Sequence, residues 1–238
     1  SMGYSMKRLC TICARGGSKG LPNKNIRQMV GKPLIAHSIL QAKSSGLFEA
    51  IAVSSDSKEI LDISKKFGAD YSVFRPKELA SDTAPKLPAI QHCVNEVEIL
   101  SGKKFDVIVD LDATSPLRIT KDIEGAVKLL EDKNVSNVIT GCPARRSPYF
   151  NLVEQDERGC VRLSKSPEQI ITRRQDAPEC FDMNASIYVW NRSGLIGSKS
   201  VFNVDTLLFV MPEERSIDVD HEWEFEYVEF LFNKRTGL

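Results

Sequence analysis

The residues best suited to chemistry in this sequence form a short loop directly behind its first hydrophobic segment. The loop combines two basic residues, a serine and three glycines, in the order Arg15, Gly16, Gly17, Ser18, Lys19 and Gly20. Glycine lets a backbone approach a ligand closely, and successive N–H groups in such a loop can bind phosphate oxygens. With Lys24 nearby, the loop predicts a polyphosphate site. It matches neither common phosphate-binding pattern, so a glycine-rich surface turn with solvated lysines stays open as the alternative.

A second candidate is a pair of carboxylates near the end of the chain, Asp218 and Asp220. On an extended segment, side chains two residues apart point the same way. Two carboxylates on one side repel each other unless a cation lies between them. Mg²⁺ suits such oxygen ligands because it keeps several waters and takes its remaining ligands from phosphate. A solvated edge, or a cap for the helix expected from about His221, is the alternative.

The elements that must position these residues alternate between strand-like and helix-like segments. Strands are expected at 9–14, 50–54, 71–74, 107–111 and 135–140, and helical patterns lie between them, the first of which opens at Lys32-Pro33. The run 107–111 is almost wholly apolar, which is typical of a parallel strand buried on both faces. Such alternation predicts an α/β fold with a doubly wound, mostly parallel sheet. Because ligands bind beyond the carboxyl ends of such strands, the loops after Ala14, Ser54, Phe74 and Leu111 are the expected site.

The alternation breaks at Cys142, and residues 143–180 are polar and irregular. This segment still carries aromatic and aliphatic residues, so it predicts an inserted arm or hairpin. Strands resume at 186–190 and 207–211, and an amphipathic helix is expected from Trp223. We therefore expect a single domain over residues 6–238 that includes the arm, whereas residues 1–5 look like a remnant of cloning.

Composition excludes several classes of function. The 32 basic residues balance 32 acidic ones, which gives no support for broad nucleic-acid binding. No apolar stretch approaches the roughly 20 residues of a membrane helix. Cys10 and Cys13 have CxxC spacing, but they lie within one strand and no second pair completes a zinc site. Buried, reduced thiols are therefore expected, together with a cytoplasmic location.

The loop belongs to a longer set of motifs that runs in one order from residue 9 to about 230. After the stretch 14–25 (ARGGSKGLPNKN) come GKPL at 31–34, SSD at 54–56, RPKELASDTA at 75–84, TSPLR at 114–118, RQ at 174–175 and SIDVD at 216–220. This ordered set resembles the acylneuraminate cytidylyltransferases, or CMP-sialic acid synthetases. The resemblance implies a Rossmann-like nucleotidyltransferase that uses Mg²⁺ to transfer CMP from CTP to a nine-carbon acidic (nonulosonic) sugar, with release of pyrophosphate. It also implies a homodimer with interlocked arms.

The resemblance further implies a role for each matching residue. The CTP phosphates would be held by Arg15, Gly16, Gly17, Ser18 and Lys19. Arg15 and Lys19 would also act in catalysis by neutralising charge on the departing pyrophosphate. Asn25 would bind the ribose, and Arg75 with the backbone of residues 80–84, including Ala84, would read cytosine. Asp218 and Asp220 would hold Mg²⁺ and belong to the catalytic set. The sugar would contact Asp112, Thr114, Ser115, Arg174, Asn184 and Tyr188.

Three departures from the family pattern concern the sugar. Asp112 stands where glutamine is common, Lys86 where a small hydroxyl residue near the base is common, and the loop at Arg145-Arg146 lacks its usual lysine. They suggest a relative of sialic acid such as legionaminic acid, with Asp112 accepting a hydrogen bond from an N-acyl N–H. CMP transfer to the eight-carbon acid Kdo, GTP-dependent activation of an amino sugar, and a non-catalytic nucleotide-binding protein stay open as alternatives.

Overall fold

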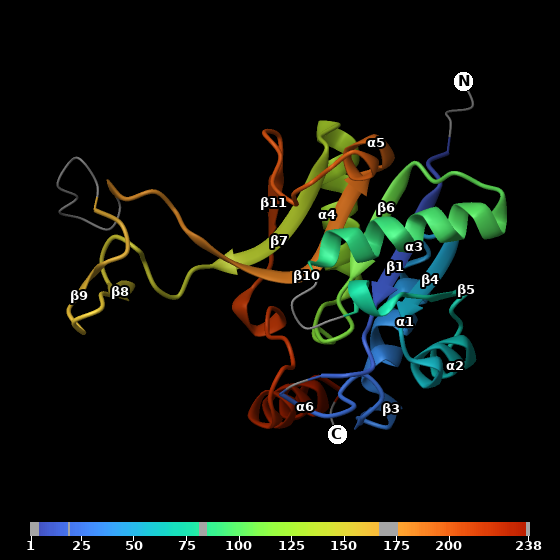
Figure 1. Ribbon diagram of the computed structural model, residues 1–238, viewed down its shortest axis with the longest axis horizontal. Helices are drawn as coiled ribbons and strands as arrows, with labels where there is room; N and C mark the ends of the chain where they lie inside the picture. Colours follow the sequence, from blue (N-terminus) through green and yellow to red (C-terminus); the bar gives the residue numbers. More distant parts are fainter. Residues whose placement is uncertain (1–4, 19, 81–84, 167–175, 237–238) are drawn as a thin grey trace.

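The computed structural model describes residues 5–18, 20–80, 85–166 and 176–236. Within them a seven-stranded sheet, in the order β11-β7-β10-β6-β1-β4-β5, carries helices on both faces (Figure 1). The strands of this sheet are β1 (Arg8–Cys13), β4 (Ala50–Ser55), β5 (Tyr71–Phe74), β6 (Val107–Leu111), β7 (Asn137–Pro143), β10 (Phe181–Asn191) and β11 (Leu207–Val210). The expected bounds of β5 and β6 are thus confirmed at both ends.

The sheet is mostly parallel, as predicted. β1 pairs in parallel with β4 and β6, β4 pairs in parallel with β5, and β11 pairs in parallel with β7. β10 runs antiparallel to both of its neighbours, β6 and β7. A strand parallel to β7 would need a crossover connection to the other end of the sheet. The chain instead leaves the sheet after β7 and re-enters it at β10 on the same side (Figure 1). The fold is therefore a mixed α/β sheet.

Two hydrophobic clusters cover the two faces of the sheet. On one face α1 (Leu34–Ser45), α2 (Lys58–Lys66) and α4 (Thr120–Lys133) pack against the strands, through buried residues such as Ile39, Ile60 and Ile123. On the other face lie α3 (Lys86–Ser101) and α5 (Arg192–Ile196), with Ile90 and Leu195 in the cluster. No helix in the described part of the chain is long and apolar enough to cross a membrane.

One expected helix start is wrong. Lys32-Pro33, expected to open a helix, forms β3 (Lys32–Pro33), which pairs with β2 (Gln28–Met29) in a small hairpin. Val30 and Gly31 form its turn with φ values of 49° and 80°. Two central residues with positive φ are typical of a tight hairpin turn. α1 therefore begins at Leu34, after the hairpin has ended.

The C-terminal helix α6 (Glu222–Thr236) closes the fold beside this hairpin (Figure 1). Phe225 and Val228 of the helix share a buried cluster with Met29, Leu34 and Leu117. Val219, just before the helix, belongs to the same cluster. This packing fixes the residues around Val219 at the carboxyl end of the strands, where the site lies.

The segment expected to form an inserted arm leaves the body between β7 and β10 and extends well beyond it (Figure 1). Its described residues include an antiparallel hairpin of β8 (Val153–Gln155) and β9 (Val161–Leu163). The hairpin is exposed, and Val153 and Val161 keep 53% and 61% of their surface accessible. The six cysteines are free, but Cys160 on this hairpin is exposed, so the expectation of uniformly buried thiols is wrong there.

Candidate nucleotide site

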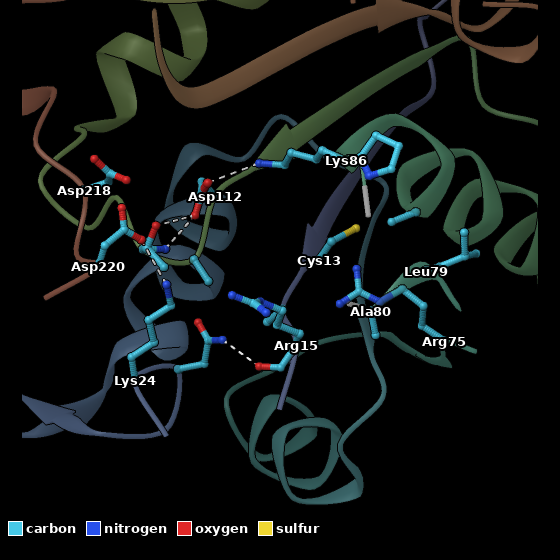
Figure 2. A pocket seen from close by; sticks show the side chains of 16 residues that line it. Cys13, Arg15, Lys24, Arg75, Leu79, Ala80, Lys86, Asp112, Asp218 and Asp220 are labelled. Atoms are coloured by element: carbon cyan, nitrogen blue, oxygen red, sulfur yellow. Dashed lines mark hydrogen bonds and ion pairs between the residues drawn. The ribbon is translucent and has the colours of Figure 1, made fainter. Parts of the chain in front are cut away.

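A pocket of about 230 Å³ opens at the carboxyl ends of the parallel strands. Three of the four loops singled out in the sequence supply its walls, namely those after β1, β5 and β6. Figure 2 shows the side chains that line it: Cys13, Ala14, Arg15, Lys24, Asn25, Arg75, Leu79, Ala80, Pro85, Lys86, Ala89, Asp112, Ala113, Thr114, Asp218 and Asp220. The strand order brings them together, because β1 lies between β4 and β6.

One side of the pocket is basic and contains buried polar atoms without a hydrogen-bond partner among the described residues. Arg75 is only 5% exposed, and within the described chain its Nε has no hydrogen-bond partner. Asn25 donates from Nδ2 to the carbonyl oxygen of Arg15 at 3.0 Å, whereas its buried Oδ1 has no partner among the described residues. Buried polar atoms are nearly always hydrogen-bonded in native structures. These two atoms therefore indicate a polar ligand.

The opposite side is acidic. Asp218 and Asp220 both face the pocket (Figure 2), because the N–H of Val219 between them donates to the carbonyl oxygen of Thr114 at 2.9 Å. Lys24 Nζ lies 3.1 Å from Asp220 Oδ1. Burial and the charge of Asp220 raise the pKa of Asp218 to about 7. Such a pair is electrostatically unfavourable by itself, so a bound cation would stabilise it.

The donor set fits Mg²⁺ better than a fully protein-bound metal. The described residues contain no group of three or more His, Cys, Asp or Glu side chains that could hold a metal. A magnesium ion commonly takes one or two carboxylates and completes its shell with waters and substrate phosphates. Asp218 and Asp220 supply that number of carboxylates in one pocket.

A partly buried ion cluster lies between the basic and acidic sides. Lys86 Nζ is 3.0 Å from Asp110 Oδ2 and 3.3 Å from Asp112 Oδ2. Asp110 is fully buried, and its Oδ1 accepts a hydrogen bond of 2.8 Å from the hydroxyl of Thr11. Burial lowers the pKa of Lys86, but the two carboxylates outweigh it and raise the pKa overall. Lys86 is therefore a permanent cation at this site.

Asp112 is held from both of its oxygens. Oδ1 accepts from the backbone N–H and the hydroxyl of Thr114 at 2.8 and 2.7 Å, and Oδ2 accepts from Lys86. Burial alone would raise the pKa of Asp112, but these partners lower it to about 2. Behind it the buried guanidinium of Arg118 donates to the carbonyl oxygen of Asp112. Asp112 and Lys86, two of the departures found in the sequence, are thus direct partners.

The comparisons with known proteins agree with this geometry. A family model described as "Cytidylyltransferase" matches residues 9–214. The chain belongs to the cytidylyltransferase family.

Two relatives and one solved structure are similar to this chain. It is similar to the CMP-N,N'-diacetyllegionaminic acid synthase of Campylobacter jejuni, with 47% identity over 96% of each chain. It is 32% identical to an N-acylneuraminate cytidylyltransferase of Streptococcus agalactiae over 94% of this chain and 52% of that protein. A solved CMP-2-keto-3-deoxy-manno-octonic acid synthetase in complex with CTP matches 96% of this chain and 99% of its own, with a TM-score of 0.69 and 18% identity. That last likeness confirms the α/β fold.

The glycine loop, residues 15–20, does not line the pocket with all of the residues that were expected to hold the CTP phosphates. Gly16, Gly17 and Ser18 belong to the described chain but do not line the pocket. The N–H of Gly16 donates to Asp56 Oδ1 at 2.8 Å, and the hydroxyl of Ser18 donates to the carbonyl oxygen of Leu21. Gly20 instead permits a close approach, because a Cβ there would clash with the carbonyl oxygen of Asp220. Lys19, Ala84 and Arg174, all expected to bind substrate, lie outside the described residues.

Of the described residues that were expected to contact the sugar, some line the pocket and others do not. Asp112 and Thr114 line the pocket. Ser115 is buried, and its Oγ has no partner within the described chain. Asn184 is buried in a hydrogen-bond network with Thr140, Ser186 and Ser216. Tyr188 is not among the residues that line the pocket, and it lines a neighbouring cavity instead.

Asp110 is the functional residue that the sequence analysis missed. It lies within β6, in a run that was interpreted only as a buried strand. An acid inside an otherwise apolar strand was the available signal, because a buried carboxylate needs a partner. That partner is Lys86, which is distant in sequence and comes from the first turn of α3.

Proposed function

We propose that this cytidylyltransferase transfers CMP from CTP to a nine-carbon acidic sugar, and that this sugar is N,N'-diacetyllegionaminic acid. The observation that carries the proposal is a single pocket with guanidinium and amide groups on one side and a carboxylate pair on the other. A triphosphate with its metal needs both. The choice of sugar is supported by 47% identity to a synthase named for that acid, against 32% for a relative named for N-acylneuraminate.

On the nucleotide side, Arg75 would read the cytosine edge and Asn25 would bind the ribose. Their unpartnered atoms, Nε and Oδ1, are the groups that a ligand would satisfy. Arg15 would hold the phosphates, because a guanidinium matches phosphate oxygens well. Lys19 is proposed to neutralise the charge that develops on the departing pyrophosphate.

On the acidic side, Asp218 and Asp220 would hold Mg²⁺. When bound, the ion would neutralise triphosphate charge and polarise the α-phosphate. Lys24, which contacts Asp220 at 3.1 Å, would orient that carboxylate and add positive charge. The raised pKa of Asp218 supports this assignment, because it reflects burial and the charge of Asp220, and a cation would offset both.

The reaction would be a displacement at phosphorus. The anomeric hydroxyl of the sugar forms a new bond to the α-phosphorus, the bond between the α-phosphorus and the bridging oxygen breaks, and pyrophosphate leaves. The proton of the hydroxyl is released to water, so each turnover yields the CMP-sugar, pyrophosphate and one proton. The protein would contribute mainly by holding both substrates in line, and such positioning can supply a large share of a rate enhancement.

Release of pyrophosphate tests the proposal. The protein is mixed with CTP, Mg²⁺ and N,N'-diacetyllegionaminic acid, N-acetylneuraminic acid or Kdo, and rates are compared. We expect the fastest turnover with the first acid, and none when GTP, ATP or UTP replaces CTP. Fastest turnover with Kdo, or use of GTP with an amino sugar, would favour the corresponding alternative enzyme. Binding of CTP without pyrophosphate release in any mixture would favour a non-catalytic protein.

We also propose a homodimer in which the arm of each protomer borders the sugar site of the other. The support is the exposed apolar surface of the arm hairpin, including Val153 and Val161, which finds no place against its own sheet. Light scattering should give twice the mass of one chain. A monomer over the micromolar range would refute the interlocked arrangement.

A cytoplasmic location is proposed from the cysteines. All six are free, and Cys160 is exposed, whereas secreted proteins usually pair their cysteines in disulfides. Fractionation of the native cell with immunodetection tests this, and recovery in an extracellular fraction would contradict it.

A further inference from the structure

Lys86 belongs to two cavities at once. It lines the nucleotide pocket and also a second cavity of about 560 Å³, here called the side cavity. The walls of the side cavity include Leu87, Pro88, Val201 and the ring of Tyr188. These are mainly apolar surfaces, and Lys86 Nζ lies 5.1 Å from the centre of the Tyr188 ring. A charged group therefore stands at the boundary between a polar pocket and an apolar one.

The side chain of Lys86 points away from the part of the pocket that is proposed to bind the nucleobase. Figure 2 shows its side chain extending toward Asp112, while the guanidinium of Arg75 lies across the pocket near Ala80. Asp112 binds Thr114, whose carbonyl oxygen holds the backbone of Val219 between the two acidic residues. The ammonium is thus linked, through Asp112 and Thr114, to the side of the pocket that carries the proposed magnesium ligands.

The charge around Lys86 limits what it can bind. Its ammonium has three N–H donors, and two carboxylates, those of Asp110 and Asp112, lie within 3.3 Å of its nitrogen. With both carboxylates ionised, the cluster has no surplus positive charge, so it does not favour another anion. A remaining N–H can still donate to a neutral acceptor. An amide carbonyl is such an acceptor, and the methyl group of an acetamido substituent suits the apolar walls of the side cavity.

We propose that Lys86 is a specificity-determining residue that donates a hydrogen bond to the carbonyl oxygen of the N-acyl group that N-acetylneuraminic acid lacks, and that the methyl group of this N-acyl group occupies the side cavity. This inference rests on the proposed function. It assigns Asp112 a positioning role, in place of the expected contact with an N-acyl N–H, because both of its oxygens are already used by Lys86 and Thr114. A sugar with a hydroxyl in the same place would leave the apolar walls without a partner.

The test compares N,N'-diacetyllegionaminic acid with N-acetylneuraminic acid, which has one N-acyl group fewer. Steady-state rates are measured with Mg²⁺ and CTP for the wild type, Lys86→Met, Lys86→Arg and Pro88→Phe. We expect Lys86→Met to raise KM for the diacetylated acid about tenfold relative to the other acid, as for loss of one charge-assisted hydrogen bond. Lys86→Arg should restore part of the preference, and KM for CTP should stay unchanged throughout.

Pro88→Phe keeps the proposal testable if Lys86→Met does not fold, because Asp110 is buried and would lose its counter-ion. It fills the side cavity without touching the ion cluster, and it should weaken the diacetylated acid selectively. Lys66→Met is the matched control: Lys66 is an exposed lysine of α2, on the opposite face of the sheet, and its loss should change neither KM.

Three results would overturn the inference, and they show whether the proposed function falls with it. If the wild type releases pyrophosphate but Lys86→Met and Pro88→Phe leave the ratio of the two sugar KM values unchanged, the role of Lys86 is wrong while the proposed function stands. A rise in KM for CTP alone has the same meaning, since Lys86 would then read the nucleotide. If the wild type turns over neither acid, the proposed function fails and the inference fails with it.

Discussion

The two halves of the sheet build their parts of the site in different ways. In the parallel half, β5-β4-β1-β6, three of the four strands end at the pocket, so Arg15, Arg75 and Asp112 arrive there directly from the ends of β1, β5 and β6. In the other half, β10-β7-β11, the chain first leaves the body through the arm and returns antiparallel. Its contribution, the pair Asp218 and Asp220, reaches the pocket only through the segment after β11, packed by α6.

The difference explains which side of the site is built locally. On the parallel half, a strand and the loop behind it are enough to place a side chain at the shared edge. On the other half, placement depends on distant packing, such as that of Val219 with Met29 and Phe225. We therefore expect substitutions on the parallel half to act mainly on binding of the nucleotide, and those in the acidic segment to act on turnover.

The largest effect should come from Asp220→Asn. Removing one of two proposed magnesium ligands should lower kcat at least about 100-fold, because the chemical step needs charge neutralisation at the triphosphate. Initial rates across a range of Mg²⁺ concentrations measure it. Glu222→Gln is the control, since Glu222 is an exposed neighbouring acid paired with Arg27, and it should keep wild-type rates. Normal turnover by Asp220→Asn would break the assignment of the acidic side.

Arg75→Met should separate the two sides. The guanidinium is buried at the pocket and lacks a partner for Nε within the described chain, so its loss should raise KM for CTP about 10- to 100-fold, as expected for a hydrogen bond from a charged group. The KM for the sugar should change little. Lys77→Met, two residues along and exposed, serves as the control. An effect confined to the sugar would contradict the placement of cytosine.

The sequence predicts the parallel half of the sheet better than the antiparallel half. Strands 71–74 and 107–111 are predicted to the residue, because periodicity and burial are local properties. The antiparallel direction of β10 is not predictable from its own residues, because it depends on how the chain returns from the arm. Likewise, the pairing of Lys86 with Asp110 joins α3 to β6. A residue pattern indicates that a buried acid needs a partner but does not identify that partner.

Even on the parallel half, the sequence does not predict the hydrogen-bond partners of the glycine loop. Its composition correctly places a loop at the end of β1, and Arg15 lines the pocket. The partner of each N–H depends on the neighbouring loop, since Asp56 after β4 accepts from Gly16 at 2.8 Å. Asp56 lies within the SSD motif noted in the sequence, but the spacing of that motif gave no indication of the contact.

Asn184→Ala should distinguish a structural role from a sugar contact on the antiparallel half. Asn184 Oδ1 accepts from Thr140 Oγ1 at 2.7 Å and from the N–H of Ser186 at 3.1 Å, and Nδ2 donates to Ser216. Losing these buried bonds should lower the free energy of unfolding by about 2 kcal/mol, measured by urea denaturation. The KM for the sugar should stay within a factor of two or so of the wild type. A stable variant with a raised sugar KM would restore the role implied by the family resemblance.

The smallest effect is expected from Ser57→Ala, which tests the parallel half away from the ligand. The hydroxyl of Ser57 caps α2 by accepting from the N–H of Ile60 at 3.3 Å. Loss of such a cap should cost about 1 kcal/mol and lower Tm by about 2–4 °C in a chain of this size. Because a Cβ placed at Gly16 would lie 2.9 Å from Cβ of Ser57, α2 directly supports the glycine loop. Ser57→Ala retains that Cβ, so KM for CTP should be unchanged, whereas Ser57→Gly should loosen the loop and raise it. Equal KM values for both variants would mean that the loop holds its position without support from α2.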